Sequence, residues 1–123
     1  MVTETFRSSR LFQVWHYTAV HGDRLLLRST AEDGVPRIDL YVEDVRCVLL
    51  EPVYRGLVVR EGTAEERRRI ETDYRIPVDT HTYVHVIGED RMTGFVVGGP
   101  LRRYEDEGDF RDPSHFGPIP GTP

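Results

Sequence analysis

The chain has 123 residues, a formal net charge of −5 at pH 7 and a single cysteine, Cys47. This length is typical of one domain, which buries about two-thirds of its unfolded surface and so forms a core without disulfides or a structural metal. One cysteine excludes an intramolecular disulfide, no apolar run approaches the roughly 20 residues that cross a bilayer, and the N-terminus lacks a secretory signal. We therefore expect a cytoplasmic protein without membrane contact.

The acidity is concentrated at the C-terminal end. Residues 1–103 hold 15 arginines against 16 acidic residues, whereas residues 104–123 hold one arginine against five acidic residues. Four of the last eleven residues are proline, a composition typical of an extended or disordered segment. The sequence thus predicts a β-rich domain over residues 1–104 and a flexible, acidic tail over 105–123. The nearly neutral domain disfavours nucleic acid as a partner.

Eight segments have the composition or the alternation of strands, and six to seven of them are expected to form. In chain order they are Leu11–Val20, Arg24–Thr30, Arg37–Glu43, Val45–Leu50, Leu57–Arg60, Val78–Ile87, Met92–Val97 and Leu101–Tyr104. Arg37–Glu43 alternates with Ile38, Leu40 and Val42 on one side, so its other side chains are expected to face solvent. The apolar run Val45–Leu50 is typical of a central strand.

The first two strands are expected to form a hairpin around Gly22-Asp23, a dipeptide that favours a type II′ turn. In that register His16 lies opposite Ser29, and both are polar residues at the edge of the core. Tyr17 lies opposite Arg28 on the other face, in position for a cation–π contact.

One helix is predicted, over Ala64 to about Tyr74. Thr63 and Glu66 have the spacing of a capping box, and Pro77 prevents the helix from continuing. The helix has few apolar residues and is expected on the surface, with the arginines of 67–69 on its solvated side. The strands and this single helix predict a mostly β fold, an antiparallel sheet curled into a small barrel or roll.

The segment from His81 to His85 carries the chemistry that most suggests a site. The period of two in a strand places His81, Tyr83 and His85 on one face. In the expected hairpin His85 lies opposite Gly94 and His81 opposite Gly98. Two imidazoles that face two glycines leave volume that a ligand could use.

These five residues, together with His16 and Ser29, are the candidate ligand-binding residues. The alternatives are that each imidazole covers its own glycine or that this face of the hairpin is solvated. A zinc ion shared by His81 and His85 is disfavoured, because four residues of a strand span about 13 Å whereas zinc ligands lie about 2 Å from the metal. The sequence predicts neither a metal site nor a cofactor.

Two classes of function fit these observations. The first is a small binding or accessory module that recognises a protein partner or a small ligand, since phosphate-loop, dinucleotide, nucleophile-elbow and zinc-protease motifs are absent. The second is a small β-barrel enzyme of the cyclase, isomerase or hydratase type, with histidine and tyrosine as acid–base groups. A cavity of at least about 300 Å³ favours the enzyme, and a filled interior favours the module. Edge strands leave a homodimer open.

Two stretches in the N-terminal half have a recognisable pattern, Phe12–Tyr17 (FQVWHY) and Leu25–Ser29 (LLLRS). In these stretches the chain resembles small stand-alone bacterial proteins with no assigned activity. The resemblance covers roughly the first fifty residues and implies no functional residue.

Overall fold

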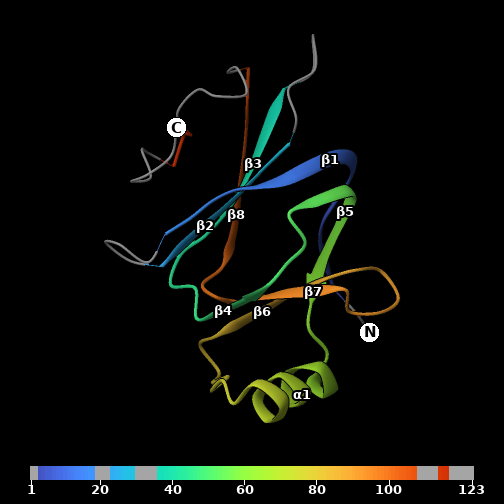
Figure 1. Cartoon of the computed structure of the whole chain (residues 1–123), viewed down its shortest axis with the longest axis vertical. Helices are drawn as coiled ribbons and strands as arrows, with labels where there is room; N and C mark the ends of the chain where they lie inside the picture. The colour runs from blue at the N-terminus through green and yellow to red at the C-terminus, as the bar shows by residue number, and fades with distance from the viewer. Residues whose placement is uncertain (1–2, 19–22, 30–35, 108–113, 117–123) are drawn as a thin grey trace.

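The computed structural model describes residues 3–18, 23–29, 36–107 and 114–116. These residues form one antiparallel sheet of eight strands with one helix (Figure 1). The elements are β1 (Glu4–Thr18), β2 (Arg24–Ser29), β3 (Arg37–Val42), β4 (Cys47–Leu49), β5 (Val53–Glu61), α1 (Ala64–Tyr74), β6 (Tyr83–Ile87), β7 (Gly94–Gly98) and β8 (Leu101–Asp106). Neighbouring strands follow the order β4-β7-β6-β5-β1-β2-β3-β8. The mostly β, antiparallel fold is confirmed, although with eight strands instead of six or seven.

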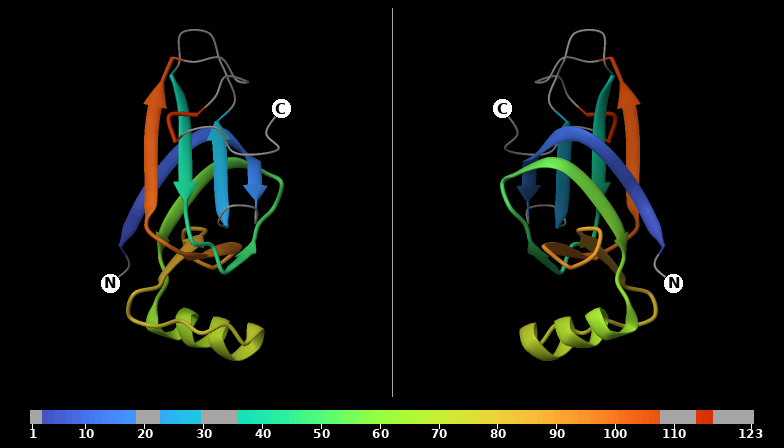
Figure 2. Two further views of the ribbon diagram at one scale, coloured as in Figure 1. Left: turned by 90° about the vertical axis from the view of Figure 1, so that its left-hand side faces the viewer. Right: turned by 90° about the vertical axis from the view of Figure 1, so that its right-hand side faces the viewer.

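A bend shared by β1 and β5 folds the sheet over. Between the pairs Ser8–Leu57 and Leu11–Arg55, two residues of β1 oppose the single residue Gly56. Gly56 has a φ of 88°, a left-handed conformation that glycine adopts without strain. A β-bulge of this kind bends the strands and increases their twist. Both strands therefore arch across the molecule, and the β2-β3-β8 end of the sheet lies across the β4-β7-β6 end (Figure 2).

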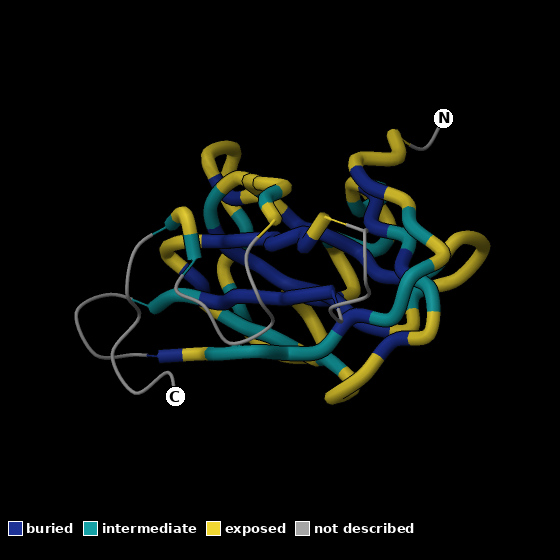
Figure 3. The backbone as a smooth tube through the Cα atoms, turned by 90° about the horizontal axis from the view of Figure 1, so that it is seen from above, coloured by how far each residue is buried: buried dark blue, intermediate teal, exposed yellow. Residues whose placement is uncertain are grey.

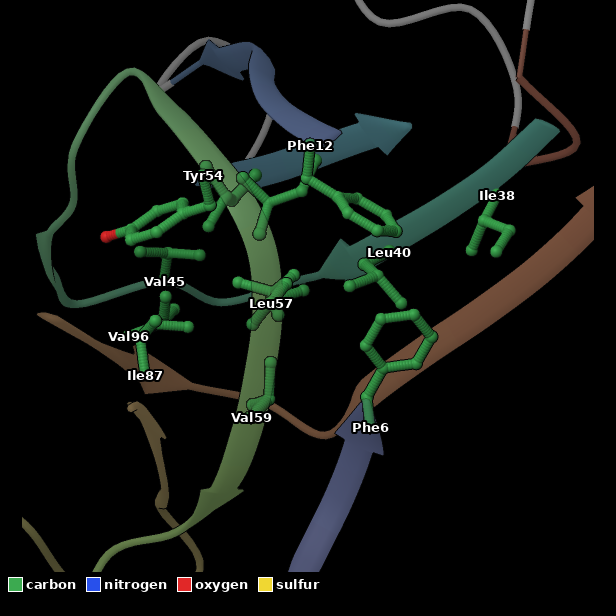
Figure 4. Packing of buried hydrophobic residues seen from close by; sticks show 13 residues of the cluster. Phe6, Phe12, Ile38, Leu40, Val45, Tyr54, Leu57, Val59, Ile87 and Val96 are labelled. Atoms are coloured by element: carbon green, nitrogen blue, oxygen red, sulfur yellow. The ribbon is translucent and has the colours of Figure 1, made fainter. Parts of the chain in front are cut away.

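The main core fills the space between these two ends of the sheet. Phe6 and Phe12, from either side of the bulge, meet edge to face with ring centroids 5.5 Å apart. Around them pack side chains from both ends of the sheet, including Leu25, Leu27, Ile38, Leu40, Val45, Leu57, Val59, Ile87 and Val96 (Figure 4). The buried stretches of the chain follow the strands (Figure 3).

The sheet does not close into a barrel, so that part of the prediction is wrong. Among the described residues, β4 and β8 form its two edges. The reason is that the folded-over sheet already fills its interior with side chains from both ends, and burial of the core does not require the two edges to pair.

A second core lies beneath the helix, on the outer face of β6 and β7. Ile70 of α1 is fully buried there and packs with Val84, Val86, Phe95 and Val97. The predicted helix and its capping box are confirmed: the Thr63 hydroxyl accepts the Glu66 N–H at 3.1 Å, and the Glu66 carboxylate accepts the Thr63 N–H at 2.9 Å. The capped start and the buried Ile70 fix α1 on this face.

The outer face of β2 and β3 is buried too, which corrects the prediction that alternate residues of β3 face solvent. Arg28 and Asp39 form an ion pair at 2.8 Å in which each side chain is only 1% exposed. The Arg28 guanidinium lies 5.1 Å from the centroid of the Trp15 ring. The Tyr41 ring stacks on Phe116 with centroids 4.7 Å apart. These aromatic rings cover the outer face, so every residue of β3 is buried.

The register of the first hairpin differs from the prediction. Tyr17 pairs with Leu25 and His16 with Leu26, so neither meets the partner that a turn at Gly22-Asp23 would give it. Five residues lie between β1 and β2 instead of the predicted two-residue turn, and this longer connection shifts the register. Gly22 itself, with the neighbouring Val20 and the later Thr30, lies outside the described residues.

The run predicted as a central strand is an edge strand. Among the described residues β4 pairs with β7 alone. Its apolar character has a different origin, because Val48 and Leu50 pack against the main core whereas Cys47 packs against the second core. Contacts on both sides of one short strand produce the same composition as a central position in the sheet.

Several strands extend beyond their predicted ends, and β5 covers Val53–Glu61 instead of Leu57–Arg60. β1 begins at Glu4 instead of Leu11, and β8 continues to Asp106, two residues past the predicted domain boundary. Asp106 accepts two hydrogen bonds from the guanidinium of Arg37, at 2.9 and 2.8 Å, and the Arg37 side chain is 2% exposed. The first residues of the predicted tail therefore belong to the sheet. Residues 108–113 and 117–123 lie outside the described residues, and their flexibility stays a prediction.

A buried ion pair connects α1 to β5. The Arg60 guanidinium binds both oxygens of Glu66, at 2.6 and 2.9 Å, and also donates to the Gly88 carbonyl. The pKa of Glu66 is lowered to about 2, mainly by the hydrogen bond from Arg60 and to a smaller extent by the hydrogen bond from the Thr63 N–H. Burial of the carboxyl group opposes this shift. Because the carboxylate is favoured in the folded state, its contribution is present above about pH 4.5 and is lost as the pH falls towards 2.

Glu66→Gln is therefore expected to lower the free energy of unfolding by about 2 kcal/mol at pH 7, because glutamine can still cap Thr63 but leaves buried Arg60 without its counter-charge. Denaturant unfolding from pH 8 to pH 2 measures this difference. It should be constant above pH 5 and shrink below pH 4.5. A difference that does not change with pH would contradict the assignment.

A chain that ends at Tyr104 is expected to be less stable than one that ends at Glu107 by about 2 kcal/mol, because only the shorter chain removes Asp106 from buried Arg37. Both chains lack residues 108–123, so the comparison isolates the end of β8. Equal midpoints in thermal unfolding would show that this ion pair is dispensable.

Candidate functional site

A cleft of about 530 Å³ opens beside the main core. It is bounded by the N-terminal part of β1, the end of β5, the start of α1, the segment that leads into β6 and the start of β8. Its lining includes the predicted residues His81, Tyr83 and His85, and also Glu61, Arg67 and Arg103. The structure thus brings together three of the seven candidate residues.

One face of β6 leads from the core into this cleft. Ile87 belongs to the main core, His85 is 4% exposed, and Tyr83 is 46% exposed. Glu61 of β5 pairs with His85 across the ladder, so its side chain lies on the same face. Burial therefore decreases in two-residue steps along β6, and His85 stands where apolar packing gives way to the cleft.

The β6–β7 register differs from the predicted one by two residues. His85 lies opposite Val96 instead of Gly94, and Tyr83 takes the place opposite Gly98 that was expected for His81. Six residues connect the two strands instead of the four between the predicted strands. This longer loop shifts the pairing by two residues, so each side chain stays on the same face of the sheet. His81 precedes β6 and is exposed.

His85 is held in one tautomer by its own hydrogen bond. Its Nε2 atom lies 2.8 Å from the carbonyl oxygen of Gly99. A carbonyl only accepts, so Nε2 carries the proton and Nδ1 keeps a lone pair. Nδ1 is buried and has no hydrogen-bond partner among the described residues.

Burial keeps this imidazole neutral. Desolvation lowers the pKa of His85, against smaller opposing effects from the Gly99 carbonyl and the Glu61 carboxylate. The position of Gly99 is itself fixed, because its N–H donates to the Glu43 carbonyl at 2.9 Å. The site therefore contains a neutral, oriented hydrogen-bond acceptor.

The Tyr83 ring lies parallel to the His85 ring, with an interplanar angle of 4° and centroids 5.9 Å apart. Tyr83 is half-exposed, whereas His85 is buried. The tyrosine is therefore the part of this pair that can move without disturbing the core.

Arg67 organises the wall of the cleft formed by residues 79–82. Its Nη2 atom donates to the carbonyls of Asp79 and Thr82, at 3.1 and 3.2 Å. The Asp79 carboxylate in turn accepts the Thr82 hydroxyl and the His81 N–H, both at 2.8 Å, and these bonds lower the pKa of Asp79. The prediction that residues 67–69 only face solvent is thus wrong for Arg67, which is half-buried against this turn.

Arg103 supplies a second cation on the opposite wall. Its guanidinium lies 5.5 Å from the centroid of the Phe6 ring and donates to Glu105 at 2.6 Å. Its side chain is 56% exposed. The lining itself holds two arginines and one carboxylate, Glu61, while the Glu105 carboxylate outside the lining partly neutralises Arg103.

The two candidate glycines do not line the cleft, and close packing explains both. A Cβ at Gly98 would lie 3.0 Å from the backbone of Asp44 and of Val45, and one at Gly94 would lie 2.6 Å from the Leu49 carbonyl oxygen. Real Cβ atoms are rarely this close to backbone. Glycine is needed there for strand packing, and the expected open volume beside these positions is filled by neighbouring backbone.

His16 and Ser29 lie apart from the cleft and from each other in the ladder. Ser29 pairs with Phe12, and its hydroxyl accepts the Ile38 N–H at 2.9 Å. His16 is half-buried opposite Leu26. The predicted pairing of these two residues is therefore wrong, because it depended on the incorrect hairpin register, and a role for them in binding stays a prediction.

Sequence reasoning missed Glu61, Arg67 and Arg103 as members of the site. Glu61 shares a ladder pair with His85, but the β5–β6 pairing spans a helix and cannot be inferred from a turn. Arg103 lies at the cleft because β8 begins at Leu101, three residues after Gly98, which pairs with Tyr83. The first relation has no local signal in the sequence, and the second depends on the β6–β7 register, which was predicted two residues away.

The described residues contain no group of three histidine, cysteine, aspartate or glutamate side chains that could hold a metal ion. Cys47 lies outside the cleft lining, and burial raises the pKa of its thiol. Within the described ranges, no helix has the length and hydrophobicity of a membrane span.

Comparisons with family models, with curated proteins and with solved structures find no match to this chain. The function is therefore inferred from the geometry of the cleft.

His85 makes stability depend on pH in a defined direction. Since folding lowers its pKa, the unfolded chain binds a proton below about pH 6.5 when the folded chain does not, and the folded state loses stability as the pH falls. His85→Gln retains an amide N–H for the Gly99 carbonyl and does not titrate. We expect the stability advantage of the wild type over this variant to shrink between pH 7.5 and pH 5 in urea unfolding. An advantage that grows over this interval would contradict the assignment.

Proposed function

We propose that this protein is a small binding module whose cleft takes a small organic ligand with an acidic group. The observation that carries the proposal is the cleft itself, with a volume of about 530 Å³ and a lining that combines charged, aromatic and apolar side chains. Small-molecule sites commonly have volumes of about 300–1,000 Å³ and a few polar groups on an otherwise apolar wall. The cleft therefore exceeds the minimum of about 300 Å³ expected of an enzyme, but the interior of the sheet is filled, as expected of a module, and the cleft lies beside it.

The charges of the lining favour an anionic ligand. Arg67 uses Nη2 for backbone carbonyls, and no partner among the described residues is seen for its other guanidinium nitrogens. Arg103 is half-exposed above the Phe6 ring. Guanidinium groups bind carboxylates with two parallel hydrogen bonds, and Phe6 and Leu101 offer apolar contacts beside them.

The state of His85 favours binding over catalysis. Burial disfavours the protonated form of His85 and so lowers its pKa, which makes Nδ1 a hydrogen-bond acceptor but a weak base. The alternative, a small enzyme of the isomerase or hydratase type, is supported by the neutral imidazole beside Tyr83 and requires these rings to separate. A cytoplasmic location, a protein partner and a homodimer stay predictions.

A thermal-shift screen against small organic carboxylates tests the proposal, and titration calorimetry of the ligands found then gives dissociation constants. Arg103→Ala should weaken binding about tenfold or more, which corresponds to about 1.4 kcal/mol. Arg102→Ala is the matched control: it is the neighbouring arginine on β8, does not line the cleft and lies 4.0 Å from Glu43. If no carboxylate stabilises the protein, or if both variants bind equally well, the proposal is wrong.

A further inference from the structure

We propose that the cleft selects hydroxy acids, with the ligand carboxylate at Arg103 or Arg67 and the ligand hydroxyl donating its hydrogen to Nδ1 of His85. The inference rests on the proposed function and adds the chemical class of the ligand. The observation behind it is a buried acceptor atom without a partner among the described residues, on a side chain that lines the cleft.

The direction of this hydrogen bond follows from the tautomer. Because the Gly99 carbonyl accepts the Nε2 proton, Nδ1 of the neutral ring can only accept. A buried acceptor that remains unpaired is unfavourable, and a ligand that supplies a donor removes this penalty. A ligand without a donor leaves Nδ1 unpaired, so the site distinguishes ligands with and without this one group.

A neutral donor suits this position better than a cation. His85 is 4% exposed, and burial of an ammonium group beside it would require a counter-charge in the same place. The carboxylate on its face, Glu61, is exposed, and the remaining charged or titratable groups of the lining are Arg67, Arg103 and the exposed His81. A hydroxyl donates one hydrogen bond and is buried without these costs.

Tyr83 is the exposed neighbour of His85 in the cleft. Its ring lies parallel to the His85 ring, and it is half-exposed with no hydrogen bond from its hydroxyl seen among the described residues. A rotation of this side chain into solvent uncovers His85 without repacking the main core. The ligand would then occupy the place of the tyrosine ring, with its apolar body against Phe6 and Leu101.

Titration calorimetry with two matched probes tests the inference on the full chain: 3-phenyllactate, a hydroxy acid, and 3-phenylpropionate, which lacks only the hydroxyl. We expect phenyllactate to bind at least tenfold more tightly to the wild type. His85→Phe keeps an aromatic ring and removes the acceptor at Nδ1, together with the hydrogen bond to Gly99, so the preference should fall to less than threefold while phenylpropionate binds as before.

The outcomes separate this inference from the proposed function. If neither probe binds, and no other carboxylate does, both are wrong. Equal binding of the two probes to the wild type would overturn the hydroxy-acid selectivity and leave the carboxylate site standing. If phenylalanine, which carries an ammonium in place of the hydroxyl, binds more tightly than phenyllactate, a cation is preferred and the inference is wrong.

A spectroscopic measurement does not depend on the variant folding. Long-range ¹H–¹⁵N spectra of the wild type report the state of each ring nitrogen. Phenyllactate should shift the His85 Nδ1 resonance towards that of a hydrogen-bonded acceptor and leave Nε2 protonated, and phenylpropionate should produce no such shift. An unchanged Nδ1 resonance at saturating phenyllactate would overturn the inference.

Discussion

The bulge shared by β1 and β5 is the constraint on which the rest of the structure depends. One extra residue in β1, opposite Gly56, bends both strands at the same place. The bend lays one end of the sheet across the other, and a single sheet thereby encloses the main core. The cleft lies where the N-terminal part of β1 meets the start of β6 and the start of β8, and Arg103 of β8 reaches the Phe6 ring there. Without the bend, Phe6 and Phe12 would not meet.

Several charged side chains are buried because the outer faces of the folded-over sheet are covered. Helix α1 covers one outer face, and aromatic rings cover another, so charged residues of β3 have no access to water. Each buried charge is paired: Arg28 with Asp39, Arg37 with Asp106. Burial of such a pair removes both charges from water, and only good hydrogen-bond geometry compensates for this. Loss of one partner therefore lowers stability more than replacement of both. His85 differs from these groups because one of its two ring nitrogens has a partner and the other has none among the described residues.

Local patterns predicted the elements well, and non-local contacts decided what was missed. The alternation of β3, the capping box of α1 and the shared face of Tyr83 and His85 are properties of a few adjacent residues, and the structure confirms their secondary structure. Strand register depends on the length of the connecting loop, and both hairpins have longer loops than turn chemistry suggested. The wrong register of the first hairpin explains why His16 and Ser29 do not face each other. In the second hairpin the register differs by two residues, so Tyr83 and His85 remain on the predicted face. The cations of the cleft come from α1 and β8, and only the tertiary fold brings these elements together.

The proposed selectivity for hydroxy acids depends on one chemical state, a neutral His85 that donates from Nε2 and accepts at Nδ1. The ¹⁵N chemical shifts of its ring in the ligand-free protein, followed from pH 8 to pH 5, measure that state most directly. The account predicts a protonated Nε2, an unprotonated Nδ1 and a titration midpoint below that of an exposed histidine. A protonated Nδ1 at neutral pH, or a ring that is already cationic there, would contradict it.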